Sequence, residues 1–263
     1  TPFSRYHGIN IDGLISPENH VIWIDTNSPE IAEGTSRTNR GEVDAIDWVL
    51  SQLATSDSFE AYNNKFSSEE DKEIGLITFY GAQLRQLRQL QGKYSGKLTL
   101  KPSSVDRFQG MERNIVIVSL VRSNCIAENE KQAPDYRVYK ELGFRKQTDF
   151  GFAKSPNRLN VALSRAKRLL IIVGNSAHYS SYKNKEGEAI YKNVFESIKT
   201  NPNGKIIHWE HKLMKKRPRP ISKNRSANLN TRDINPETDG HLRVIETWLR
   251  PNANRTNPKI AVL

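Results

Sequence analysis

Five short apolar runs that alternate with helical patterns constrain the fold of this 263-residue chain more than any other feature. The runs have the length of strands and are rich in Val, Ile and Leu: VIWID (21–25), IGLIT (74–78), NIVIVSLV (114–121), LLIIVG (169–174) and KIIHW (205–209). Continuous apolar runs of this kind are typical of strands buried on both faces of a parallel sheet. Helical patterns such as EVDAIDWVLSQL from Glu42 and AQLRQLRQL from Ala82 lie between them, so we expect a doubly wound α/β fold.

Three segments fall outside this alternation and set the predicted domain boundaries. Residues 1–20 show little periodicity and are predicted to connect the domain to something upstream. The domain itself is expected over residues 21–211, with a polar, charged insertion at 125–150. Residues 212–263 are predicted to form a basic tail that contains one short amphipathic helix, HLRVIETWL, at 241–249.

The net charge of +11 suggests a polyanionic partner, but it is concentrated in one place. Seven Lys and Arg residues lie between Lys212 and Arg225, which leaves +4 for the rest of the chain. A basic, proline-containing run is explained equally well by nucleic-acid contact or by a solvated linker.

Cysteine usage and hydropathy bear on the cellular compartment. The single cysteine, Cys125, excludes an internal disulfide framework, and no Cys/His spacing indicates a metal site. The sequence has no signal-peptide pattern and no apolar run long enough to span a bilayer. We therefore expect a soluble, intracellular protein in a reducing compartment, with no membrane partner.

The segment RLNVALSRAK (158–167) combines an apolar stripe with basic residues. As a helix it places Leu159, Ala162, Leu163 and Ala166 on one stripe, and Arg158 and Arg165 on another. A buried strand is predicted directly after it. This pattern indicates an arginine that is held rigidly near the middle of the domain.

Two long blocks carry a family resemblance. SSVDRFQGMERNIVIVSLVRSN (103–124) and RLNVALSRAKRLLIIVGN (158–175) resemble motifs V and VI of superfamily 1 helicases, in the branch that contains the nonsense-mediated-decay helicase and Senataxin. GTSRTNRGE (34–42) and IGLITFYGAQ (74–83) resemble two further segments of that family, in the same order. The resemblance covers about residues 21–209. It implies the second RecA-like motor domain of a two-domain helicase, with a P-loop NTPase-type parallel sheet.

The same resemblance implies a division of labour over ATP. The segment GKYSGKL (92–98) lacks the spacing of a Walker A loop, and no apolar strand ends in paired acids that would hold magnesium. ATP and Mg²⁺ are therefore expected to bind mainly through an upstream, N-terminal RecA-like domain of the same polypeptide. We expect this chain alone to be inactive in ATP hydrolysis.

The resemblance also implies roles for individual residues at the nucleotide. Arg165 corresponds to the arginine finger, which stabilises charge on the transferred phosphoryl group. Gly110 and Glu112 would approach the nucleotide, and Gln109 would couple that site to the nucleic acid. Arg158 is explained equally by a nucleotide contact or by pairing with an acid, and Glu112 is alternatively explained by pairing with Arg113.

Polar residues that lie at or just after the ends of two predicted strands are candidates for binding a single strand of DNA or RNA. Hydroxyl, amide and guanidinium groups at such positions hold phosphates with little sequence specificity and strong salt dependence. The candidates are Thr78, Tyr80, Gln83, Arg122 and Asn124, of which Tyr80 is alternatively a core residue. Asn39 and Glu42 match the family but, as a plain helix N-terminus, need no further role.

The function expected from these residues is that of an ATP-dependent 5′-to-3′ DNA or RNA helicase. The alternative is a non-catalytic α/β module that binds nucleic acid or protein and carries degenerate motor motifs. A third interpretation, a nuclease with carboxylates around Asp135 and Glu141, rests only on scattered acids. The family's second nucleotide-contacting arginine is not recognisable in TPFSRYHG at the start of the chain.

Overall fold

A computed structural model describes residues 6–33, 36–123, 150–183 and 187–209. Its centre is a six-stranded sheet with the strand order β5-β4-β6-β7-β1-β8, in which every neighbouring pair is parallel. The strands are β1 (Val21–Thr26), β4 (Ile74–Thr78), β5 (Leu100–Ser104), β6 (Arg113–Ser119), β7 (Ala166–Gly174) and β8 (Gly204–Trp209). The predicted doubly wound α/β fold is confirmed. All five predicted strands are present, and β5 is an addition.

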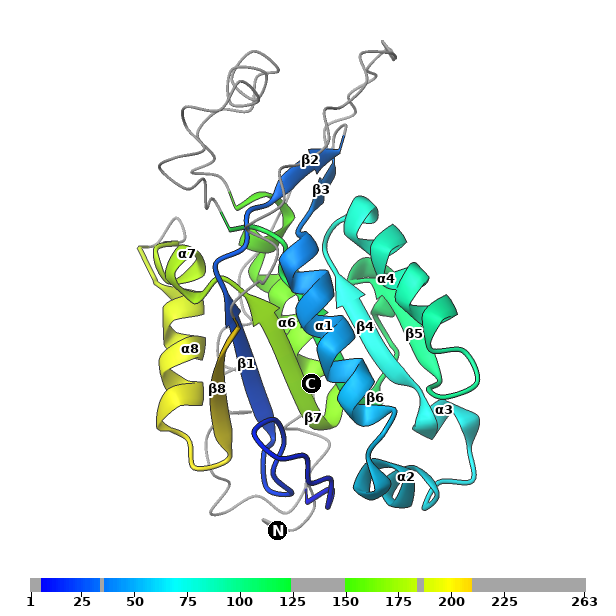
Figure 1. The fold of residues 1–263 in the computed structure, drawn as a ribbon. Coiled ribbons are helices and arrows are strands. Elements are labelled where there is room, and N and C mark those ends of the chain that lie inside the picture. The colour runs from blue at the N-terminus through cyan, green and yellow to red at the C-terminus, as the bar shows by residue number, and fades with distance from the viewer. Residues whose placement is uncertain (1–5, 34–35, 124–149, 184–186, 210–263) are drawn as a thin grey trace.

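Helices cover both faces of the sheet and make a three-layer molecule (Figure 1). One core joins the sheet to α1 (Arg40–Leu53), α2 (Asp57–Asn63) and α4 (Gly81–Lys93). The other core joins it to α6 (Pro156–Ser164), α7 (Ser176–Ser180), α8 (Ile190–Thr200) and the 3₁₀ turn η2 (Asp106–Phe108). The short helices α3 (Glu69–Lys72) and η4 (Gly151–Lys154) complete the helices among the described residues.

The central strands explain why their sequences are apolar without alternation. In β6, Ile115 and Ile117 belong to the α1 core, whereas Val116 and Val118 belong to the α6 core. All seven residues of β6 are buried. Because successive side chains point to opposite faces, a strand covered on both faces has to be apolar throughout.

Residues 6–20, predicted as a connector, contribute to the core. Ile9, Leu14 and Ile15 are at most 1% exposed and pack in the α1 core. The buried His7 imidazole accepts from the Ile9 amide and contacts the Asn19 carbonyl, which ties the start of this segment to its end. The burial puts this segment inside the hydrophobic core of the domain.

A small antiparallel hairpin rises beyond the carboxyl ends of the strands (Figure 1). It consists of β2 (Ile31–Glu33) and β3 (Ser36–Thr38), paired with Ile31 opposite Thr38. It lies between β1 and α1 in the chain, and the apolar pattern did not predict it.

The sheet has a topological switch between β4 and β6. After β4 the chain passes through α4 on one face to reach β5, whereas after β6 it passes through α6 on the other face to reach β7. In open α/β sheets the crevice at such a point, outside the carboxyl ends of the strands, is where ligands bind. Thr78 and Ser119, the last residues of the two strands, pair with each other there.

Several predicted features lie outside the described residues. These are the insertion at 125–149 with Cys125, Asp135 and Glu141, and the basic tail with the helix at 241–249. Among the helices that the structure does describe, none has the length and apolarity needed to span a membrane.

Candidate functional site

The junction between α6 and β7 positions the predicted arginine finger. Ser155 caps the start of α6 by accepting from the Arg158 amide, and Leu159, Ala162 and Leu163 bury the predicted stripe. The helix was expected to continue to Lys167 but ends at Ser164, because Ala166 already pairs with Arg113 in the sheet. Arg165 is therefore the single residue that links the helix to the strand.

Arg165 lies beside the loop that carries Gly110 and Glu112. The Arg113 amide, at the start of β6, donates to the Arg165 carbonyl at 3.0 Å. The Arg165 Nε donates to the Val161 carbonyl at 3.3 Å, so the side chain runs back along α6. Its two terminal nitrogens have no hydrogen-bond or ion-pair partner in the part of the chain that the structure describes, which leaves them available to an anion.

The Gly110 backbone offers an open approach at the same edge. Gly110 has a φ of 85° and is exposed, and a Cβ built on it would meet nothing within 4 Å. Glu112 is half-buried, and its carbonyl accepts from the Arg113 guanidinium, whose carboxylate partners are Glu70 and Glu73. The loop after η2 thus offers an unobstructed glycine backbone, and Arg113, which follows that loop, ties it to the backbone of Arg165.

Arg158 already has an acidic partner, and Gln109, the neighbour of Gly110 in the chain, is exposed. Arg158 pairs with Asp106 of η2 at 2.9 Å, and its guanidinium lies 5.1 Å from the centre of the Phe152 ring. Of the two explanations of Arg158, the structure shows the pairing with an acid. Seven residues of helix place Arg158 about 10 Å from Arg165 along the axis. Gln109 is exposed at the end of η2.

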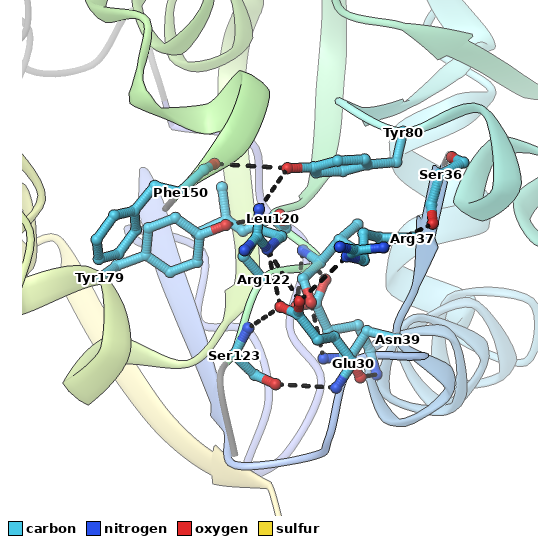
Figure 2. Close-up of polar contacts among 12 residues, drawn as sticks. Glu30, Ser36, Arg37, Asn39, Tyr80, Leu120, Arg122, Ser123, Phe150 and Tyr179 are labelled. Atoms are coloured by element: carbon cyan, nitrogen blue, oxygen red, sulfur yellow. Dashed lines mark hydrogen bonds and ion pairs between the residues drawn. The ribbon is translucent and has the colours of Figure 1, made fainter. Parts of the chain in front are cut away.

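At the opposite ends of the strands, Tyr80 and Arg122 lie near the half-buried carboxylate of Glu30. Figure 2 shows Glu30 between Arg122 and Arg37, with the nearest atoms at 2.9 and 3.4 Å. The Arg122 Nη1 also donates to the Tyr80 hydroxyl at 3.3 Å. Burial alone would lower the pKa of Arg122, but Glu30 and Tyr80 outweigh it and raise that pKa.

Gln83 belongs to a second network of hydrogen bonds, which is buried. Its Oε1 accepts from the Asn39 amide at 2.9 Å, and its Nε2 donates to the Ser119 hydroxyl at 2.8 Å. Gln83 and Asn39 are both fully buried. Thr78 is also fully buried, and its hydroxyl has no hydrogen-bond partner among the described residues.

The structure thus brings the predicted nucleic-acid residues together but does not expose them. Tyr80 is 4% and Arg122 3% exposed, so direct contact with a strand requires these side chains to leave their present partners. Asn124 lies outside the described residues. Direct nucleic-acid contact by this group stays a prediction.

Glu42, to which the sequence assigned no role, is a central residue of this edge. Its carboxylate is fully buried and accepts from the Ser119 hydroxyl and the Val121 amide. Burial raises the pKa of Glu42 to about 8, and the hydrogen bonds from Ser119 and Val121 only partly oppose that effect. Glu30 was likewise missed. Glu42 matches the family at a predicted helix start, but no local pattern at either position indicates these buried contacts.

A metal centre would need several ligating side chains in one place. The described ranges contain no group of three or more His, Cys, Asp or Glu side chains arranged to hold a metal ion.

Helicases and a regulator of nonsense transcripts from several organisms are similar to this chain. The DNA polymerase alpha-associated DNA helicase A of Saccharomyces cerevisiae is 31% identical over 162 residues, which cover 59% of this chain and 19% of that protein. The putative helicase MOV-10 of Gallus gallus is 34% identical over 153 residues, which cover 56% and 14%. The regulator of nonsense transcripts 1 homolog of Drosophila melanogaster is 33% identical over 166 residues, which cover 60% and 11%. The chain thus spans less than a fifth of the length of each relative.

A family model gives the same assignment over more of the chain. The model AAA_12, described as an AAA domain, matches residues 5–177, which include both motif blocks and the candidate site residues described above. The resemblance to superfamily 1 helicases predicted from the motifs is confirmed by this match and by the relatives. The chain belongs to the AAA_12 family, the AAA domain of superfamily 1 helicases related to the regulators of nonsense transcripts.

Proposed function

We propose that this chain is the second motor domain of an ATP-dependent DNA or RNA helicase. In this proposal it supplies Arg165 to a nucleotide held mainly by an N-terminal RecA-like domain of the same polypeptide. It also supplies part of the groove for a single strand. The names of the relatives support this assignment, since they include an ATP-dependent helicase of Saccharomyces cerevisiae that is 32% identical over 161 residues.

One observation carries the proposal: the position of Arg165 next to the Gly110 loop. Arg165 is fixed to β7 on one side and hydrogen-bonded to the first residue of β6 on the other, yet its terminal nitrogens are uncommitted among the described residues. ATP, when bound, supplies the phosphoanhydride bond that is hydrolysed. A guanidinium at this edge would neutralise charge on the phosphoryl oxygens during that reaction. Gly110 would let the backbone approach, and Glu112 would contact the sugar side.

The single strand is proposed to lie at the carboxyl edge. Tyr80 and Arg122 lie at the topological switch, and Gln83, Asn39 and Ser119 form a buried network directly behind them. The buried network fixes the shape of this edge, so Gln83 and Thr78 act in this proposal by positioning the surface. Contacts from such an edge would be directed at phosphates, and they would therefore weaken as salt rises.

ATP hydrolysis by the parent polypeptide tests the proposal, with and without single-stranded DNA or RNA. Arg165→Ala should lower kcat by about 10³-fold or more while the protein remains folded. Arg88→Ala is the matched control, because Arg88 is an exposed arginine on α4, away from both edges.

The outcomes separate the two functional classes. Stimulation by nucleic acid that is lost in Arg165→Ala and kept in Arg88→Ala supports the motor. Normal hydrolysis by Arg165→Ala rejects the arginine-finger role. Absence of any hydrolysis in the wild-type parent polypeptide favours the non-catalytic binding module.

A further inference from the structure

The backbone at Val121, directly after β6, is in a rare conformation. Val121 has a φ of 73° and is the only residue other than glycine with a positive φ among those the structure describes. The Arg122 amide donates to the Leu120 carbonyl at 2.9 Å, which makes Val121 the centre of a three-residue turn. Turns of this kind with positive φ are rare and strained, and a β-branched side chain adds to the strain. Such a turn persists only where its surroundings impose it.

Glu42 stabilises the turn by accepting a hydrogen bond from the Val121 amide. Both of its carboxylate oxygens lie 2.9 Å from the Val121 nitrogen, and Oε2 also accepts from the Ser119 hydroxyl at 2.6 Å. The pattern Asn39-x-x-Glu42 would ordinarily direct this carboxylate to the Asn39 amide in a capping box. Here Gln83 takes the Asn39 amide instead, so the Glu42 side chain is free to turn toward β6.

The remaining backbone groups of the turn are held as well. The Asn39 Nδ2 donates to the Val121 carbonyl at 3.1 Å, and the Tyr179 hydroxyl donates to the Leu120 carbonyl at 2.6 Å. Glu42 is the member of this set that binds the Val121 amide itself. Without an acceptor there, a buried N–H would be left unpaired at a strained residue.

The turn sets the positions of the next two residues, Arg122 and Ser123. The Arg122 Nε and the Ser123 amide each donate a hydrogen bond of 2.9 Å to the Glu30 carboxylate. The Glu30 amide in turn donates to the Ser123 hydroxyl at 3.0 Å. Glu30 immediately precedes the β2–β3 hairpin. Figure 2 shows this connection between the end of β6 and the base of the hairpin.

We propose that Glu42 is a positioning residue, which holds the strained turn at Val121 and thereby fixes Arg122 and the base of the β2–β3 hairpin at the carboxyl edge. The consequence for nucleic-acid binding rests on the function proposed above. The positioning of the turn and the hairpin does not.

Two substitutions of similar size separate the hydrogen bonds of Glu42 from its packing. Glu42→Gln offers an acceptor to the Val121 amide and a donor to the Ser119 hydroxyl, whereas Glu42→Met fills a similar volume with no acceptor oxygen. Hydrogen exchange of the described hairpin residues and of residues 121–123 should rise about tenfold or more in Glu42→Met and stay within about twofold of wild type in Glu42→Gln.

A second pair tests whether strain at Val121 is what Glu42 opposes. In the Glu42→Met background, Val121→Gly should slow exchange at Arg122 and Ser123 relative to Val121→Ala, because glycine adopts positive φ without strain. Both substitutions remove the two γ-methyl groups of the buried Val121, and the methyl group that alanine retains favours the Ala variant, so slower exchange with Gly can come only from the backbone. If Glu42→Met does not fold, the same Gly-against-Ala comparison with Glu42 retained gives the answer, and equal or faster exchange with Gly overturns the proposal.

The affinity of the chain for a fluorescein-labelled oligouridylate separates this proposal from the function on which it rests. Glu42→Met should weaken binding about tenfold and Glu42→Gln should not. Unchanged exchange in a folded Glu42→Met overturns the positioning role. Faster exchange in Glu42→Met together with unchanged affinity, or together with no binding by the wild type, supports the positioning role and rejects this end of the sheet as the single-strand site.

Discussion

Glu42 is an acid in a place where its charged form is disfavoured. Burial raises its pKa to about 8 from an ordinary value of 4.5. The folded state therefore holds the proton more tightly than the unfolded state does. The stability that this group contributes is fully present below about pH 4.5 and is lost as the pH rises toward 8.

This titration gives a pH prediction for a single residue. Glu42→Gln resembles the protonated side chain and does not titrate, so the free energy of unfolding of the wild type should fall relative to this variant between about pH 5 and 8. The slope should be at most about 1.4 kcal/mol per pH unit. Urea denaturation of the two proteins at several pH values measures it. If the free energies of unfolding of the wild type and Glu42→Gln changed with pH in the same way, the raised pKa of Glu42 would be contradicted.

The docking of η4 against the carboxyl edge is a feature at the scale of an element. The structure places the Gly151 backbone so close to the Tyr80 and Arg122 side chains that a Cβ would overlap the Tyr80 hydroxyl and lie 2.7 Å from the Arg122 Nη1. Gly151 also has a φ of 52°. Only glycine satisfies both conditions without displacing the pair.

Gly151→Ala should therefore destabilise the chain and disturb the edge. Overpacking of this kind costs about 1–3 kcal/mol, beyond the cost of the positive φ itself. Gly96→Ala is the matched control, since Gly96 has a φ of 81° with open space around it. Thermal unfolding of both variants isolates the steric part. Equal destabilisation by the two substitutions would show that η4 can move away from Tyr80 and Arg122 without lowering the free energy of unfolding.

Four of the five strands that the sequence patterns predicted are central strands, β1, β4, β6 and β7, which are apolar throughout because the sheet is covered on both faces. The fifth, β8, is an edge strand without a fully buried residue, in which Ile206 and Ile207 pack against the two cores. β5 was missed because it is an edge strand that contains Pro102 and two serines, and an edge tolerates a residue with no amide to donate. The hairpin was missed because each of its strands has only three residues.

Within the candidate sites, the sequence predicted which residues belong together but did not predict which of their side chains are exposed to solvent. The motifs assigned Arg165 and Gly110 to one predicted site and Tyr80 and Arg122 to the other. In the structure, Arg165 is hydrogen-bonded to Arg113, which follows the Gly110 loop, and Arg122 is hydrogen-bonded to Tyr80. Burial of Arg122 and Gln83 depends on partners far away in the sequence, such as Glu30 and Asn39. No local pattern records a contact of that kind. The role of Glu42 was hidden for the same reason, because its partner lies 79 residues away.

At the scale of the whole molecule, the two candidate sites lie at opposite ends of the strands of one sheet. Arg165 and Gly110 lie at the start of β6 and β7, whereas Tyr80 and Arg122 come after the ends of β4 and β6. A strand of this length separates the edges by about 20 Å. The proposed nucleotide and single-strand sites are therefore too far apart for one side chain to serve both.

Substitutions at the two edges should consequently separate the two activities. Arg165→Ala should leave the affinity of the chain for a labelled oligouridylate within about twofold of wild type, with the same slope of log affinity against log salt concentration. Anisotropy titrations at several salt concentrations measure both quantities. A shallower slope in Arg165→Ala would show that this arginine neutralises a phosphate of the strand.

The single-residue link between α6 and β7 has a mechanical consequence. A catalytic group on a long loop swings independently of its scaffold, and its arrival is then set by how fast the loop orders. Arg165 has no such slack, because the helix ends one residue before it and the sheet begins one residue after it. In the proposed motor, Arg165 would therefore move together with its domain, and the timing of each turnover would be set by how fast the two motor domains approach each other.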